Sequence, residues 1–148
     1  MKIQVKNQQR IIKINQQKII SLLKKALHLL NLHKAEISVL FVNDRRMRIL
    51  NHQYRGVDRT TDVLAFPQIE TKIPNLELKP QNFILGDIVI NLHKAKRQAI
   101  EYGITFNTEV KKLLIHGILH LIGYDHEKGG YPEKKMRRKE RELFEKIH

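Results

Sequence analysis

The chain has 148 residues, of which 41% are hydrophobic, and it carries a formal net charge of +13 with no cysteine. This length predicts one domain spanning residues 1–148 with enough apolar side chains for a core, so we exclude a globally disordered chain. The composition also excludes disulfides and thiolate metal sites, and no apolar run reaches the roughly 20 residues of a membrane span. Residues 1–10 are mostly polar and show no apolar region of a signal peptide, and the absence of cysteine fits a reducing cytoplasm, so we expect a cytoplasmic location.

The positive charge is concentrated in one part of the chain. Residues 1–55 contain twelve Lys and Arg against two acidic residues. A basic surface attracts polyanions such as RNA, although it also has a simpler role in solubility. Only 6% of the residues are aromatic, so a base-stacking platform is not indicated, and we expect contacts to the phosphate backbone to dominate.

The first 42 residues predict a strand, a helix and a second strand. Residues 1–5 alternate as in a short strand, and residues 36–42 are rich in β-branched and aromatic side chains, which predicts a buried strand. Between them we expect a helix that is capped by Asn15 and runs to about Leu32. Its apolar stripe consists of Ile19, Leu22, Leu23, Ala26, Leu27 and Leu30.

A second helix is expected from Arg45 to about Tyr54, with Asn43 or Asp44 as its N-cap. Arg55 follows at the helix C-terminus, just before a glycine. A cation in that place has an ordinary electrostatic explanation worth about 0.3–1 kcal/mol. The residues alone therefore give Arg55 no functional role.

The middle of the chain predicts two further strands. Residues 62–66 form the first, after a polar loop over residues 56–61, and residues 82–91 form the second. Residues 68–81 contain two prolines and predict a surface loop or an extended excursion over the sheet. Gly86 indicates a bulge or a close approach of backbone in the second strand.

The rest of the chain predicts three helices, so the full order of elements is β-α-β-α-β-β-α-α-α. We therefore predict an α+β fold in which helices pack on a mixed four-stranded sheet. The helices cover residues 93–102, about 109–122 and 133–147, the middle one capped by Thr105 or Asn107 and the last one preceded by a break at Gly129, Gly130 and Pro132.

Three histidines have the spacing of metal ligands. His116 and His120 are four residues apart on the predicted helix, so their side chains lie roughly 6 Å apart on one face. Gly123 can end the helix in the left-handed conformation and let the chain bring His126 over the same point. Three imidazoles with an open fourth position are typical of a catalytic zinc, here at the C-terminal end of the helix and the following turn.

The same spacing occurs in the metzincin proteases, in which a Glu follows the first His as general base. Here that position is Gly117, which has no side chain to take a proton from water. A structural zinc is a further interpretation, although such sites usually have four protein ligands. Asp125, next to His126, remains open as the fourth ligand.

Residues 116–126, HGILHLIGYDH, resemble the signature of the YbeY-type rRNA maturation factors, which are zinc-dependent endoribonucleases of bacteria. Residues 51–67, NHQYRGVDRTTDVLAFP, and residues 85–90, LGDIVI, are similar to two further blocks of that family. Thr60 departs from the family pattern, because many members have Pro at that position. The resemblance covers nearly the whole chain and implies the same α+β fold.

The resemblance also implies a function and roles for residues. One Zn²⁺ held by His116, His120 and His126 would polarise a phosphoryl oxygen and lower the pKa of water to about 7. Arg55 matches the family's functional arginine and would stabilise charge on the phosphoryl oxygens. Asp125 would orient a ligand imidazole or simply lie at the surface. The implied substrate is single-stranded RNA, and the implied role is maturation of the 3′ end of small-subunit ribosomal RNA and ribosome quality control, with the ribosome as partner.

Two other functions stay open at this stage. The metzincin-like spacing suggests a metal-dependent protease or another hydrolase, against which Gly117 counts. The basic charge suggests a noncatalytic RNA-binding factor in ribosome assembly with a structural zinc.

Overall fold

The computed structural model describes residues 1–68, 81–124 and 130–148. Within these ranges the strands and helices follow the predicted order, which confirms the α+β fold. The strands are β1 (Lys2–Asn7), β2 (Ala35–Val42), β3 (Val63–Pro67) and β4 (Phe83–Asn91). The helices are α1 (Gln16–Leu29), α2 (Asp44–Arg55), α3 (Leu92–Tyr102), α4 (Phe106–Leu121) and α5 (Gly130–Lys146).

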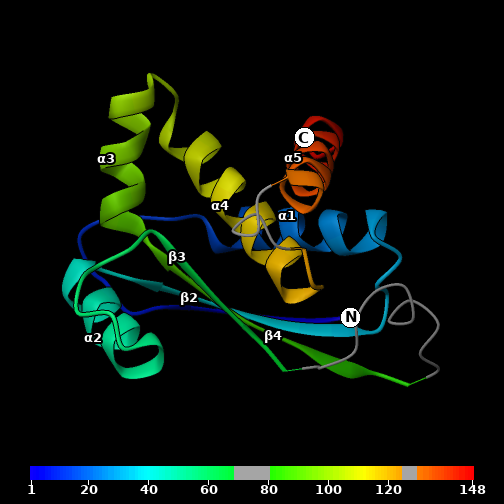
Figure 1. Ribbon diagram of the computed structural model, residues 1–148, viewed down its shortest axis with the longest axis horizontal. Coiled ribbons are helices and arrows are strands. Elements are labelled where there is room, and N and C mark those ends of the chain that lie inside the picture. Colours follow the sequence, from blue (N-terminus) through cyan, green and yellow to red (C-terminus); the bar gives the residue numbers. More distant parts are fainter. Residues whose placement is uncertain (69–80, 125–129) are drawn as a thin grey trace.

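The sheet is mixed, with the strand order β1-β2-β4-β3 (Figure 1). β1 pairs with β2 and β2 with β4 in parallel, whereas β3 pairs with β4 in the antiparallel direction. Among the described residues, β3 therefore forms one edge of the sheet. This edge strand borders the candidate site.

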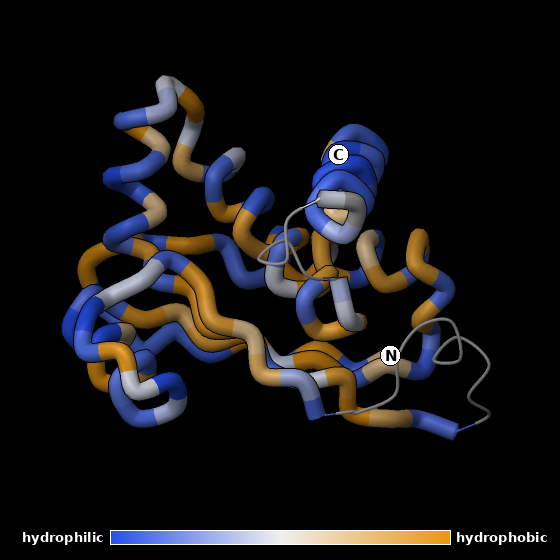
Figure 2. Tube along the Cα trace, in the orientation of Figure 1, coloured by the Kyte–Doolittle hydropathy of each residue, from blue (hydrophilic) through white to orange (hydrophobic). Residues whose placement is uncertain are grey.

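The helices form two layers, with α2 on one face of the sheet and α1, α3, α4 and α5 on the other (Figure 1). Neighbouring residues of a strand enter different cores, because side chains alternate across a strand. Ile88 of β4 packs in the larger core with α4, whereas Val89 packs in the smaller core with α2. Hydrophobic residues accordingly gather along the strands, and α5 is largely hydrophilic (Figure 2).

The predicted helix starts are largely confirmed. The side chains of Asn15, Asn43 and Thr105 accept backbone hydrogen bonds of 3.1, 2.9 and 3.1 Å at the starts of α1, α2 and α4. The predicted end of α1 near Leu32 is wrong, because the helix stops at Leu29. The predicted break at Pro132 is also wrong, because proline is tolerated in a first turn, and α5 already begins at Gly130.

Gly86 lies at a bulge of β4 and at a close approach of the neighbouring backbone of β3, as its place in the strand suggested. The register between β2 and β4 shifts next to it, between Glu36 and Ile37. A Cβ atom at Gly86 would overlap the carbonyl oxygen of Phe66 and lie 2.8 Å from Leu121 Cδ2. Glycine here lets the edge strand and the end of α4 meet over β4.

Among the described residues, none of the helices combines the length and the apolar composition that crossing a membrane requires. The predicted loop over residues 68–81 lies, apart from its two ends, outside the described residues.

Candidate functional site

His116 and His120 lie on one face of α4 and point at each other. Their Nε2 atoms are 3.0 Å apart, and their rings meet edge to face with centroids 4.5 Å apart. Both rings line one cavity, and both are only partly buried. The helical spacing predicted this pair, and the structure brings the two nitrogens together.

The direction of these imidazoles follows from the packing of α4 on the sheet. Gly117 lies directly over Ile88 of β4, where an added Cβ would be 2.9 Å from Ile88 Cγ2. Because Gly117 faces the sheet, His116, one position earlier, is turned toward the cavity. A glutamate at position 117 would enter the core, so the metzincin type of general base has no room here.

Glu140 of α5 is a site residue that the sequence did not indicate. Its Oε1 is 2.8 Å from His116 Nδ1, and the two side chains are 32% and 24% exposed. A carboxylate only accepts, so Nδ1–H of His116 donates to Glu140. In the tautomer that has its single proton on Nδ1, the lone pair lies on Nε2, the atom that faces His120. This arrangement is common around metal-binding histidines, whose second nitrogen is usually held by a carboxylate or a carbonyl.

The pair fits a metal ion. Zn–N bonds of about 2.0–2.1 Å in a tetrahedral site place two ligand nitrogens about 3.3 Å apart, close to the observed 3.0 Å. The third predicted ligand, His126, and the neighbouring Asp125 lie outside the described residues. In residues 1–68, 81–124 and 130–148 no group of three suitable side chains could hold a metal, so the full ligand set stays a prediction.

Arg55 lines the same cavity from the end of α2. The helix stops there because Gly56 adopts the left-handed conformation, with φ of 70°. Its guanidinium is exposed and has no hydrogen-bond or ion-pair partner in the part of the chain that the structure describes. By contrast, Arg48 on the same helix is bound to Asp58 at 2.9 Å. Arg55 is thus available to an anion in the cavity.

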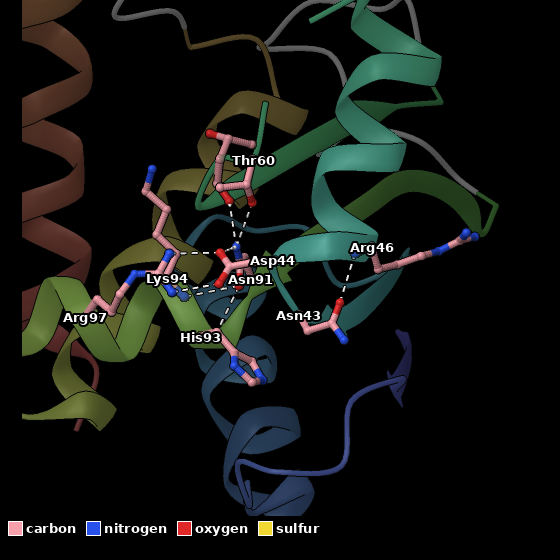
Figure 3. Close-up of polar contacts among 9 residues, drawn as sticks. Asn43, Asp44, Arg46, Thr60, Asn91, His93, Lys94 and Arg97 are labelled. Carbon is pink, nitrogen blue, oxygen red and sulfur yellow. Dashed lines mark hydrogen bonds and ion pairs between the residues drawn. The ribbon is translucent and has the colours of Figure 1, made fainter. Parts of the chain in front are cut away.

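A buried amide fixes the loop that leads into β3 (Figure 3). Asn91 Nδ2 lies 2.8 Å from Asp44 Oδ1, 3.0 Å from Thr60 Oγ1 and 3.2 Å from the carbonyl oxygen of Thr61. Arg97 donates to both oxygens of Asp44 and lowers the pKa of that carboxyl from 3.8 to about 2. Thr60, the departure from the family pattern, thus contributes its hydroxyl to this network.

The cavity has a volume of about 840 Å³ and extends around the edge strand. Val63 and Ala65 of β3 pack with the core on the α4 side, whereas Leu64 and Phe66 pack with the core on the α2 side. All four line the cavity, so it reaches from the imidazoles to the end of α2. A bound chain could lie across β3.

The end of the cavity near α3 is acidic. Gln98 donates one amide group to Asp62 at 3.3 Å and to Glu109 at 2.7 Å. Glu109 is only 2% exposed, and its other oxygen is 3.8 Å from Lys112 Nζ. The sequence showed Glu109 only as an acidic residue in the first turn of α4, and its contact with α3 is a tertiary feature.

Comparison with known proteins agrees with the sequence motifs. A family model described as "Endoribonuclease YbeY" matches residues 4–148. The protein of that name from Aquifex aeolicus is 44% identical over 91% of this chain and 85% of its own length. The one from Thermodesulfovibrio yellowstonii is 37% identical over 98% and 96%. A solution structure from Thermotoga maritima superposes with a TM-score of 0.68 at 28% identity, covering 98% of this chain and 88% of that one.

Proposed function

Because the chain belongs to the family of Endoribonuclease YbeY, we propose that it is a metal-dependent endoribonuclease that cuts single-stranded RNA. The observation that carries this proposal is the His116–His120 pair, with Nε2 atoms 3.0 Å apart in a cavity that also contains Arg55. Its biological role would be maturation of the 3′ end of small-subunit ribosomal RNA and ribosome quality control, with ribosomal RNA and the ribosome as partners. This role and the cytoplasmic location stay predictions from the sequence.

We assign one Zn²⁺ to His116, His120 and His126. Zinc bound there would supply Lewis-acid chemistry and make hydroxide available near neutral pH. Glu140 supports the assignment because it fixes the proton of His116 on Nδ1 and leaves Nε2 for the metal. In this proposal Glu140 orients the imidazole of His116, which is the role that the sequence suggested for Asp125.

Arg55 acts on the substrate in this proposal. Its guanidinium can donate two hydrogen bonds to the oxygens of one phosphate, and these bonds strengthen as negative charge develops on those oxygens during cleavage. The other basic residues lie mostly on the surface, such as Lys18, Lys24 and Lys25 on α1, which are exposed. They would attract RNA over longer distances without touching the scissile bond.

The protease alternative is disfavoured by the packing of Gly117 on Ile88, since no side chain at position 117 could reach the cavity. The noncatalytic alternative, with a structural zinc, would leave Arg55 only its electrostatic role at the C-terminus of α2.

The test compares four purified proteins for cleavage of a single-stranded oligoribonucleotide, with bound zinc measured in each. We expect His116→Ala to lose zinc and activity, and Arg55→Ala to keep zinc but lose roughly 100-fold in kcat, as for removal of one transition-state donor. His52→Ala, which changes an exposed histidine of α2, should match the wild type. Equal cleavage by all four proteins would show a contaminating nuclease and refute the proposal.

A further inference from the structure

Aromatic rings are few in this chain, yet they gather at the cavity. Three of the four tyrosines and one of the five phenylalanines line it. They come from four different parts of the chain: Tyr54 from α2, Phe66 from β3, Tyr102 from α3 and Tyr124 from the segment after α4. The low aromatic fraction argued against a stacking platform, but a fraction of the whole chain does not show where the rings lie.

Tyr54 and Phe66 form a pair at the end of the cavity that lies on the α2 side of the sheet. Their ring centroids are 5.3 Å apart and the rings are tilted by 58°. Phe66 is anchored by packing against the smaller core, whereas Tyr54 is 61% exposed. A ring that served only to cover the core would be buried, so the exposure of Tyr54 leaves an aromatic surface available to a ligand.

From this placement we propose that Tyr54, supported by Phe66, forms a stacking site for one nucleobase of the RNA substrate. The site would hold a nucleotide that flanks the cleaved bond, and it rests on the proposed endoribonuclease function.

The neighbouring charge supports a nucleotide as the ligand. Arg55 follows Tyr54 directly and lines the same cavity with an exposed guanidinium. A cation beside an exposed aromatic ring matches the phosphate and the base of one nucleotide, the combination found where proteins bind single strands. Proteins stack bases in this way with little sequence preference, because every base has a π face.

The site also gives a physical reason for a preference for single strands. The cavity bends around the edge strand β3, from the imidazoles on one face of the sheet to Tyr54 on the other. A base that stacks on Tyr54 gives up its stacking on a neighbouring base, and unstacking costs least in a single strand. A duplex would therefore bind poorly even where its phosphates reach Arg55.

The test measures KM and kcat of the zinc-loaded protein on a short single-stranded oligoribonucleotide and on a series with one abasic nucleotide at each position in turn. We expect Tyr54→Leu to raise KM about tenfold, within the roughly 5- to 160-fold range for one stacked base, with zinc content unchanged. Tyr54→Trp, which keeps an aromatic face, should stay within about twofold of the wild type. Ile49→Ala is the control, because Ile49 is exposed on the same helix and does not line the cavity.

The decisive result is the combination of protein and substrate changes. One abasic position should raise the wild-type KM about tenfold and should have no further effect on Tyr54→Leu, because the same contact is lost in both cases. Effects that multiply, or a Tyr54→Trp variant as weak as Tyr54→Leu, would overturn the proposal. If Tyr54→Leu does not fold, the wild-type protein and the abasic series still test the proposal. It is overturned if no abasic position raises the wild-type KM by more than about twofold. Failure of the proposed function is separate, since it shows as equal cleavage of the intact oligonucleotide by the wild type and His116→Ala.

Discussion

Gly117→Ala tests how closely α4 packs on the sheet, which decides where His116 points. The new Cβ would lie 2.9 Å from Cγ2, 3.0 Å from Cδ1 and 3.2 Å from Cγ1 of Ile88, which is fully buried. Overpacking of this kind costs about 1–3 kcal/mol, whereas replacing a helical Gly by Ala returns about 1 kcal/mol. We therefore expect a net loss of about 1 kcal/mol in the free energy of unfolding and a decrease in Tm of about 2–4 °C.

Urea unfolding followed by circular dichroism measures this loss, and Ile88→Ala supplies the control background. Ile88→Ala alone should cost about 2–5 kcal/mol, because it leaves a cavity under α4. In that background Gly117→Ala should stabilise the protein by about 1 kcal/mol, since the clash is gone and only the helix propensity remains. If Gly117→Ala stabilises the protein equally in both backgrounds, the helix does not press on Ile88 and our explanation for the missing general base is wrong.

Three further predictions concern single groups. Glu140→Gln should weaken zinc binding roughly 10- to 100-fold, measured in competition with a chromophoric chelator. The control, Glu145→Gln, changes an exposed residue of the same helix and should leave zinc binding unchanged. Equal zinc affinities of the two variants would show that Glu140 does not support the site. Asp44→Asn should cost about 1 kcal/mol at pH 7 after allowance for a side chain that is 40% exposed. Because the pKa of Asp44 is lowered from 3.8 to about 2, this stabilisation is present above pH 3.8 and disappears as the pH falls toward 2. If the free energies of unfolding of variant and wild type differ by the same amount throughout this pH range, the prediction is contradicted. The affinity for RNA should fall with added salt. Arg55→Ala should make the slope of log K against log salt shallower by about 0.7, the value for loss of one phosphate contact to a single strand. An unchanged slope would mean that Arg55 touches no phosphate.

The sequence predicted those parts of the fold that depend on local patterns. The caps at Asn15, Asn43 and Thr105 and the alternation in the strands are set by residues close together in the chain, and so is the His116–His120 spacing.

The remaining features depend on contacts between distant elements. Glu140 is one acid among several on a charged helix, and only the docking of α5 brings it to His116, 24 residues away. Tyr54 and Phe66 meet around the edge strand, which no local pattern could indicate. In the same way, Gly117 looked like a missing catalytic residue, whereas its packing on Ile88 gives a structural reason for glycine.

The direct test of the metal centre is a zinc titration of metal-free protein, comparing the wild type with His120→Ala and with the exposed control His52→Ala. If the imidazoles of α4 hold the ion, the wild type and His52→Ala bind one zinc per chain, and His120→Ala loses that binding while its far-ultraviolet circular dichroism stays unchanged. Full-strength binding of zinc by His120→Ala would place the metal elsewhere and contradict the account.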